Sequence, residues 1–303
     1  VRSIKINVYR VTRDSQILNA LINAVSNGKN VTVFLELQAR FDEENNLYWS
    51  NRLKDYGATV LHGGEDVKVH SKLIQITRVS RFRKQLITHV GTGNFHERTA
   101  RIYGDLGLIT ADAAIGQEVE KVFRMLESNK FNYRYKELLV SPLNTRRRII
   151  SMIQNEINNV KKGKKGAIWI KLNNVTDQEL IEWLYKASNS GVKVHMIIRG
   201  ICCLVPGIIN QSENITVYSI VDRFLEHARV LKFYNEGKPL TYIGSADWME
   251  RNLDHRVEVM TPIKDPAIMK DIDVMLEYQL KGNVKTRIIG KSQKNKYRKV
   301  EKN

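Results

Sequence analysis

Two short segments of the chain, VKVHSKL and FLEHARVL, place a histidine two positions before a basic residue. Both have the apolar, partly β-branched composition of strands, in which residues i and i+2 point to the same face. We therefore expect Lys72 to lie beside His70. Arg229 would lie beside His227 in the same way. A histidine can attack phosphorus or carry a proton, and a fixed cation neutralises phosphoryl oxygens, so the pattern predicts phosphoryl transfer.

Each histidine segment is followed by a glycine loop, GTGN or GSAD, and then by an acidic residue, Asp105 or Glu258. A reacting histidine needs a partner on its second ring nitrogen to fix its tautomer and orientation. The two acids are the candidates for this role. The last loop residue, Asn94 or Asp247, and the loop amides could add hydrogen bonds to phosphate oxygens.

The second half of the chain repeats the first. Residues 14–28 and 177–191 align without a gap at an offset of 163 residues, and an offset of 153 aligns Asp105 with Glu258. One strand histidine by itself is more often structural than catalytic. Here the two halves have diverged but keep a histidine, a cation, a glycine loop and an acid at equivalent positions. This repetition favours a catalytic role for the two histidines over a structural one. His89 and His96 lie near the first loop, and we interpret the remaining histidines, His62, His195 and His255, as structural.

The elements that must position these residues read as strand, helix, strand in each half. Asp14 and Asp177 are the expected N-caps, and Gly28 and Gly191 the expected helix ends. The pattern predicts an α/β fold in which each half is a mixed, largely parallel sheet flanked by helices. We place the domains at 1–138 and 139–303, with a basic C-terminal tail that frays. The expected elements are strands 3–11, 29–37, 167–172 and 192–200 and helices 14–28 and 177–191.

Arginines stand at the ends of three expected strands: Arg10, Arg40 and Arg199. Ligands of α/β sheets bind at the carboxyl ends of the strands. A guanidinium there can donate to two phosphate oxygens at once, so we interpret all three as phosphate-binding residues.

The composition is that of a globular protein, with 42% hydrophobic residues, but the net charge is +17. Such an excess favours a polyanionic partner, whether nucleic acid, anionic membrane or phosphate polymer, although a basic surface can also serve solubility alone. The adjacent Cys202 and Cys203 do not suit a disulfide or a metal site, which indicates a cytoplasmic location, with membrane association left open. The chain starts with Val and enters a strand at once, which suggests a fragment of a longer protein.

These motifs resemble the phospholipase D superfamily and, more closely, its polyphosphate kinase branch, which builds inorganic polyphosphate from ATP. A phospholipase D motif would carry Asp five residues after the lysine, where this chain has Thr77, and this departure favours the kinase branch. The matching stretches span essentially the whole chain: VYRV, ELQARFDEE, KVHSKL, THVGTGNFHERTARIYGD, LNTRRR, SIVDRFLEHAR and SADWMERNLDHRVEV.

The resemblance implies roles for the two histidines and for the ATP site. His70 is at the position that such kinases phosphorylate, and His227 is at that of the second histidine, which protonates the leaving group. Tyr103, Arg199 and His227 are at positions that contact ATP. The fold implied is two tandem phospholipase D-like domains.

The resemblance also implies Mg²⁺, ATP or ADP, and polyphosphate as cofactor and substrates. Arg10 and Arg40 stand at the family's magnesium site. Because an arginine has no lone pair for a cation, we interpret both as holding phosphate oxygens beside the metal. The further partners implied are N-terminal domains of the same polypeptide and a homo-oligomer, and no nucleic acid is expected.

Two alternatives remain open from the sequence. The first is a phospholipase D-like phosphodiesterase, which would hydrolyse a diester without ATP. The second is a polyanion-binding module without catalysis, in which replacing His70 would leave all behaviour intact. Covalent labelling of the protein by γ-labelled ATP separates both alternatives from a kinase.

Overall fold

The computed structural model describes residues 1–37, 43–63, 67–282, 284–292 and 294–298. The chain forms two compact units, each of which takes segments from more than one part of the sequence. The first unit consists of Val1–Asn144, Gly244–Ala246 and Asp254–Thr261, and the second of Thr145–Ile243, Asp247–Leu253 and Pro262–Asn303. The expected domain boundary at residue 138 therefore does not coincide with the limits of these units, and as a division by sequence it stays a prediction.

The first unit contains a six-stranded mixed sheet in the order β3-β2-β1-β5-β6-β8. The pairs β1–β2 and β2–β3 are parallel, and the pairs β1–β5, β5–β6 and β6–β8 are antiparallel. The mixed sheet was expected, but parallel pairing is confined to three strands because β5 and β6 form a hairpin. The strands are β1 (Ser3–Val8), β2 (Asn30–Leu35), β3 (Thr59–His62), β5 (Leu73–Val79), β6 (Lys84–Gly91) and β8 (Gly107–Thr110).

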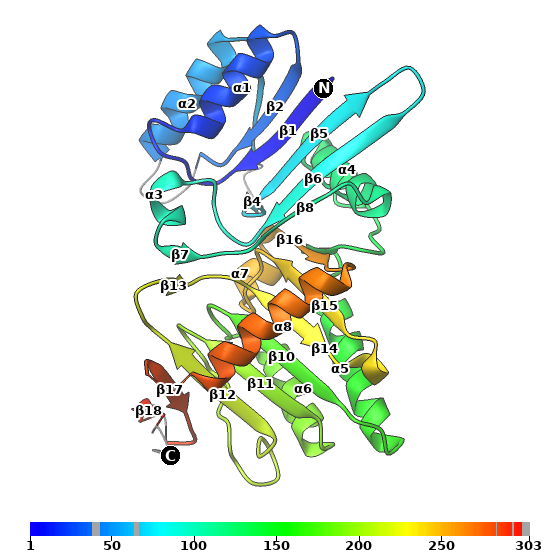
Figure 1. Ribbon diagram of the computed structural model, residues 1–303, viewed down its shortest axis with the longest axis vertical. Coiled ribbons are helices and arrows are strands. Elements are labelled where there is room, and N and C mark those ends of the chain that lie inside the picture. Colours follow the sequence, from blue (N-terminus) through cyan, green and yellow to red (C-terminus); the bar gives the residue numbers. More distant parts are fainter. Residues whose placement is uncertain (38–42, 64–66, 283, 293, 299–303) are drawn as a thin grey trace. The chain divides into compact units, whose positions relative to one another are not determined.

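Helices cover both faces of this sheet, with α1 and α2 on one face and α4 on the other (Figure 1). Alternation along β2 shows how the sequence directs this, because Val33 and Leu35 belong to the core under α1 and α2 while Phe34 belongs to the core under α4. Phe34 contacts Phe123 of α4 at a ring separation of 5.7 Å. The helices are α1 (Gln16–Ser26), α2 (Glu43–Asp55), α3 (Glu97–Ala100) and α4 (Ala113–Ser128).

A second group of strands in the first unit joins distant parts of the chain. Strand β16 (Arg256–Pro262) pairs in parallel with β4 (Lys68–Val69) and antiparallel with β9 (Leu139–Ser141). Its Val257 and Val259 are fully buried in the core under α4. A strand of the second sequence repeat thus completes the unit built by the first repeat.

The second unit contains a seven-stranded mixed sheet in the order β18-β17-β12-β11-β10-β14-β15. Strands β10, β11 and β12 pair in parallel, as β1, β2 and β3 do in the first unit. The strands are β10 (Ala167–Leu172), β11 (Lys193–Ile198), β12 (Ile215–Ile220), β14 (Val230–Phe233), β15 (Leu240–Gly244), β17 (Thr286–Ile289) and β18 (Lys296–Tyr297).

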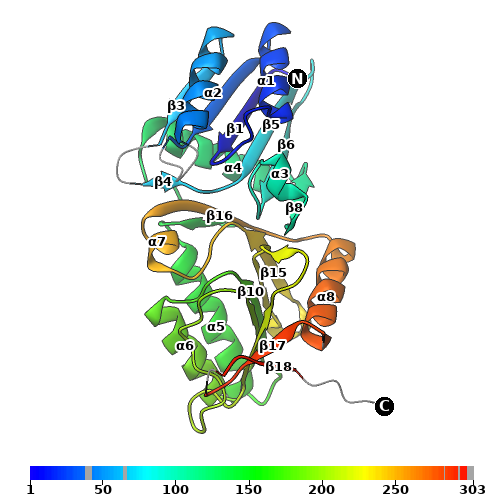
Figure 2. The ribbon, with the colours of Figure 1, turned by 90° about the vertical axis from the view of Figure 1, so that its left-hand side faces the viewer.

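Helices also flank the sheet of the second unit, with α5 and α6 on one side and α8 on the other (Figure 2). The bounds are α5 (Thr145–Lys161), α6 (Gln178–Asn189), α7 (Glu250–Leu253) and α8 (Pro266–Lys281), with a short 3₁₀ turn at Asn235–Gly237. Among the described residues, no helix combines the length and apolar character needed to span a bilayer.

The predicted helix ends are close to those of the structure: Asp177 agrees, and Gly28, expected as the C-cap, stands one residue after the C-cap Asn27. Asp177 is the N-cap of α6 and accepts a hydrogen bond from the amide of Leu180. Gly28 and Gly191 follow the helices with φ of 71° and 91°, a conformation that favours glycine. The expectation for Asp14 is wrong, because α1 begins one residue later and Ser15 is its N-cap.

The C-terminal tail was expected to fray, but part of it extends the sheet. Strand β17 pairs antiparallel with β12, which places Arg287 opposite Ser219. Strand β18 then pairs with β17. Backbone hydrogen bonds to an exposed sheet edge order this basic segment although its sequence shows no apolar periodicity.

Candidate active site

The segment that carries His70 is not a continuous strand, which corrects the premise drawn from the sequence. Residues 70–72 separate β4 from β5. The amides of His70 and Ser71 both donate to the carbonyl of Val257, at 3.0 and 2.9 Å. Two successive amides on one acceptor interrupt the regular ladder, so the chain bends where the histidine stands.

The buried side chain of Asn7 holds this bend from β1. Its amide nitrogen donates to the carbonyl and hydroxyl oxygens of Ser71, at 2.5 and 2.7 Å. Its amide oxygen accepts from the amide of Leu73 at 2.6 Å. Asn7 therefore uses both ends of its amide to fix the backbone on the C-terminal side of His70.

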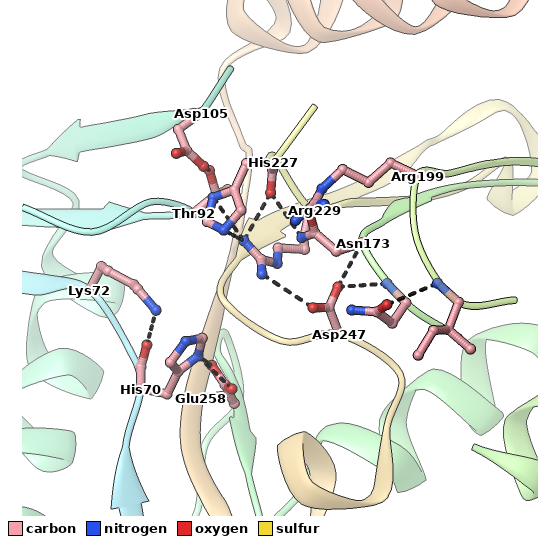
Figure 3. Close-up of polar contacts among 12 residues, drawn as sticks. His70, Lys72, Thr92, Asp105, Asn173, Arg199, His227, Arg229, Asp247 and Glu258 are labelled. Atoms are coloured by element: carbon pink, nitrogen blue, oxygen red, sulfur yellow. Dashed lines mark hydrogen bonds and ion pairs between the residues drawn. The ribbon is translucent and has the colours of Figure 1, made fainter. Parts of the chain in front are cut away.

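Glu258, and not Asp105, is the partner of the His70 ring within the first unit. Nδ1 of His70 lies 2.8 and 2.9 Å from the two carboxylate oxygens of Glu258 (Figure 3). The side chain of Glu258 is fully buried, and that of His70 is 13% exposed. This geometry suits an Nδ1–H that donates to the carboxylate, which leaves the lone pair of Nε2 for a reaction.

Burial lowers the pKa of His70 to about 4, because the surroundings disfavour a charged ring. The negative charge of Glu258 acts against this shift, whereas the positive charges of Lys72 and Arg256 add to it. Burial acts to raise the pKa of Glu258, but His70, Lys72 and Ser245 together lower it below its usual value. His70 is therefore a neutral imidazole at neutral pH, held by an ionised carboxylate.

We predict that His70 stays neutral on acidification from pH 7 to about pH 5, since an unfolded histidine titrates near 6.5 and the folded one at about 4. Between these values the unfolded chain binds the proton more readily. The contribution of His70 to the free energy of unfolding is thus full above about pH 6.5 and is lost as the pH falls toward 4. An NMR titration of the ring measures this, with the chain in urea as control. A native pKa at or above 6.5 would contradict the prediction.

Lys72 is almost fully buried next to His70, as the two-residue spacing predicted. Its ammonium group donates a hydrogen bond to the carbonyl oxygen of His70. It also lies 5.8 Å from the ring centre of Tyr9, and that ring meets His70 edge to face at 4.9 Å. Tyr9 therefore packs against both the histidine and the cation, a contact that the sequence analysis missed.

The hydroxyl residues of the two glycine loops position the two acids. Thr92 donates to Asp105 at 2.6 Å and accepts from the amide of Leu106 at 2.9 Å. At the same offset of 153, a hydrogen bond from Ser245 helps to hold the pKa of Glu258 low, and Ser245 accepts from an amide of β16. Both hydroxyl residues belong to the repeated loop motif, but their contacts with the acids could not be predicted from it.

The glycine between Thr92 and Asn94 leaves room for Asp105. A Cβ atom on Gly93 would lie 2.1 Å from a carboxylate oxygen of Asp105, far inside contact distance. The glycine is thus required by the close approach of the acid to the loop.

The segment around His227 shows the same interruption in the second unit. His227 lies between β13 (Leu225–Glu226) and β14, so it too stands outside a continuous strand. The buried amide of Asn173 donates to the carbonyl oxygen of His227 at 3.2 Å. Asn173 therefore supports this histidine segment from the end of β10, as Asn7 does from β1.

Arg229 contacts the His227 ring, as the spacing predicted. Its Nη1 lies 3.2 and 3.1 Å from the two ring nitrogens and donates to the carbonyl oxygen of the same histidine at 2.9 Å. Because the lone pairs of the two ring nitrogens diverge, an atom nearly equidistant from both cannot be aligned with either. The guanidinium thus lies against the ring itself.

Asp247, the last residue of the second glycine loop, has contacts on both carboxylate oxygens. One carboxylate oxygen is 3.2 Å from Nη2 of Arg229, and the other accepts from the amides of Asn173 and Asn174 at 2.7 and 3.3 Å (Figure 3). Although burial disfavours its charge, Arg229 and these amides keep the pKa of Asp247 low. Asp247 is therefore a buried support for Arg229.

Three other predicted site residues, Arg199, Tyr103 and Arg10, lie at or next to the ends of strands. Arg199 directly follows β11, and its Nε donates to the amide oxygen of Asn173. Tyr103 begins β7 (Tyr103–Gly104) of the first unit. Arg10 lies just beyond β1, with its guanidinium 5.8 Å from the Tyr9 ring centre. Arg40 is outside the described residues.

The described side chains do not fit a magnesium ion held by the protein alone. Among the residues that the structure describes, no three His, Cys, Asp or Glu side chains are grouped so that they could hold a metal ion. Arg10, at one expected position, carries a guanidinium that cannot ligate a cation. The chemistry of this side chain fits phosphate oxygens instead.

Comparisons with protein families and with known proteins agree over the whole chain. The family model described as "Polyphosphate kinase C-terminal domain 1" matches residues 1–132, and "Polyphosphate kinase C-terminal domain 2" matches residues 138–303. The chain is 52% identical to a polyphosphate kinase of Vibrio parahaemolyticus and 45% identical to that of Escherichia coli. Each alignment covers 98% of this chain and 43% of the relative.

Solved structures show the same fold. The crystal structure of a polyphosphate kinase from Porphyromonas gingivalis matches with a TM-score of 0.92 and 42% identity, over 99% of this chain and 46% of that one. A phosphatidylserine synthase of Haemophilus influenzae matches with a TM-score of 0.59 and 11% identity, over 95% of this chain and 82% of that one, a likeness of fold alone. The expected fold of two α/β halves, each with a mixed sheet flanked by helices, is thus also the fold of the Porphyromonas gingivalis polyphosphate kinase.

Proposed function

The chain belongs to the polyphosphate kinase family, and on this premise we propose that it transfers the γ-phosphate of ATP reversibly to inorganic polyphosphate through a phosphohistidine. The observation that supports this most directly is the neutral, oriented imidazole of His70. Its Nδ1 is engaged by a buried carboxylate, its Nε2 keeps a lone pair, and a buried ammonium lies beside it. A pre-oriented neutral nucleophile near a fixed cation is what attack on phosphorus requires.

In the proposed reaction Nε2 of His70 attacks the γ-phosphorus of ATP. The N–P bond forms while the bond from phosphorus to the β,γ-bridging oxygen breaks, and ADP leaves. A terminal oxygen of polyphosphate then attacks the phosphohistidine, which breaks the N–P bond and lengthens the polymer by one phosphate. Glu258 holds Nδ1–H throughout and stabilises the positive charge that develops on the ring.

Residues equivalent by the internal repeat have different, complementary proposed roles. His227 is proposed as the general acid that protonates the leaving oxygen of ADP, and Arg229 as the cation that holds its ring. Asp105, the repeat equivalent of Glu258, is proposed as a further catalytic acid, held by Thr92. Lys72 is proposed to neutralise charge on the transferred phosphoryl group.

The proposed substrate contacts come from the remaining predicted residues. Tyr103 and Arg199 are assigned to ATP, and Arg10 and Arg40 to phosphate oxygens. Magnesium commonly binds through substrate phosphates with few protein ligands, so it is proposed to arrive with ATP. The chain spans about 43% of the length of the curated relatives that it matches. N-terminal domains of the same polypeptide are therefore proposed partners.

Labelling tests the proposal directly. The purified protein is mixed with γ-labelled ATP and magnesium, isolated without acid, and digested for mapping by mass spectrometry. We expect an acid-labile phosphate on His70 that is removed by added ADP, because the transfer is reversible. Hydrolysis of a phosphodiester without any labelling would favour the phosphodiesterase alternative. If the protein is not labelled and hydrolyses no phosphodiester, the remaining alternative is a module that binds polyanions without catalysis.

A further inference from the structure

A pocket of the second unit brings the C-terminal segment to the strand end that carries Arg199. Its volume is about 400 Å³, which is within the range of ligand-binding cavities. It opens at the carboxyl ends of the parallel strands β11 and β12, where ligands of α/β sheets bind. The lining residues are Arg199, Gly200, Cys202, Ser219, Val221, Arg287, Ile289 and Asn295.

The charge of this pocket selects an anion. Two of its lining residues are arginines, and none of the described residues that line it is acidic. Ser219 adds a hydroxyl opposite Arg287 in the sheet register. The thiol of Cys202 is not a competing reactive group, because burial raises its pKa to about 11.

Both arginines are held in position from outside the pocket. Nε of Arg199 donates to Asn173, the residue that also supports the carbonyl oxygen of His227. Arg287 donates to the hydroxyl of Tyr297 at 2.9 Å, and its guanidinium lies 4.6 Å from the centre of that ring. Two separately anchored guanidinium groups form a pre-organised site with little side-chain entropy left to lose on binding.

We propose that Arg287 joins Arg199 in binding a linear oligophosphate, so that the basic C-terminal segment is part of the substrate site. The ligand is either the triphosphate of ATP or the end of a polyphosphate chain. This choice of ligands rests on the proposed function. Pairing of β17 with β12 places Arg287 at the pocket. A frayed tail would not hold Arg287 there.

Isothermal titration calorimetry of the purified protein with tripolyphosphate, ATP and adenosine tests the proposal at fixed ionic strength. We expect Arg287→Gln to weaken tripolyphosphate binding on the order of tenfold, the usual effect of losing one charge-assisted contact. The matched control is Lys285→Gln, which removes the same charge from an exposed position two residues away and should change binding less than about twofold. Adenosine affinity should be unchanged in both variants.

Two further variants separate binding from folding. Tyr297→Phe removes only the hydroxyl that accepts from Arg287, so we expect a smaller loss of affinity, about twofold to threefold, with unchanged circular dichroism. Arg287→Lys keeps the positive charge but loses the planar guanidinium. Its affinity for tripolyphosphate should lie between those of the wild type and Arg287→Gln.

The outcomes identify the ligand as well as the site. Weakened binding of both ATP and tripolyphosphate assigns the pocket to the nucleotide triphosphate, and weakened binding of tripolyphosphate alone assigns it to the polymer. If the Arg287→Gln and Lys285→Gln variants bind tripolyphosphate with equal affinity, the proposal is wrong, even if ATP labels His70. Conversely, if His70 is never labelled but Arg287→Gln loses tripolyphosphate affinity, the phosphohistidine proposal fails and the oligophosphate site remains.

Discussion

Replacing His70 by alanine is expected to lower phosphate labelling by γ-labelled ATP at least about a thousandfold, to the level of background. The substitution removes the atom that forms the N–P bond, and no adjustment of the neighbouring side chains can replace a nucleophile. Removing the ring also takes the hydrogen-bond donor from the buried carboxylate of Glu258, so we expect some loss of stability beside the loss of labelling. Labelling is measured after acid-free isolation, and circular dichroism reports folding.

The matched control for this variant is His195→Ala. His195 lies on β11, where its ring bonds the hydroxyl of Thr216 at 3.0 Å, and it has no proposed part in the reaction. We expect this variant to be labelled at close to the wild-type rate. Full labelling of His70→Ala, or equal loss in both variants, would contradict the assignment of His70 as the nucleophile.

Replacing Asp247 by alanine is expected to lower the free energy of unfolding by about 3–5 kcal/mol, the cost of leaving a buried charge without its partner. Arg229 is 4% exposed and would lose the carboxylate that lies 3.2 Å from its Nη2. The backbone amides of Asn173 and Asn174 would lose their acceptor as well. Urea denaturation followed by circular dichroism measures the loss.

An exposed ion pair of the same unit provides the comparison. Lys232 and Asp273 also form an ion pair, but the side chain of Asp273 is 42% exposed. Water and salt screen such a pair, so Asp273→Ala should cost less than about 1 kcal/mol. If the two alanine variants have similar free energies of unfolding, the buried pair of Arg229 and Asp247 does not stabilise the fold more than an exposed pair does.

Local sequence patterns predicted the repeated elements well, because each depends on near neighbours. The strand at 167–172 and the N-cap of the helix that follows at Asp177 are where periodicity and capping chemistry placed them. The bend at His70 could not be predicted in this way. It depends on Asn7 and on the carbonyl of Val257, which are distant in sequence and come from two other strands.

The candidate site was predictable in its residue types and not in its pairings. The duplication singled out both histidines, both cations and both acids, yet spacing alone could not assign Glu258 to His70. Tyr9 and Asn7 were missed because a tyrosine and an asparagine at a strand end carry no motif. The contact of the Asp247 carboxylate with the buried Arg229 could not be predicted from the sequence, because spacing does not show which side chains meet.

The passage of β16 into the first unit has a consequence for protein synthesis. Glu258 is made 188 residues after His70, and Val257 and Val259 fill the core beside helix α4. A nascent polypeptide that has left the ribosome only as far as Asn144 therefore lacks both a core strand and the partner of its histidine. Gene fragments divided at that midpoint should yield two insoluble products that recover structure only when they are expressed together.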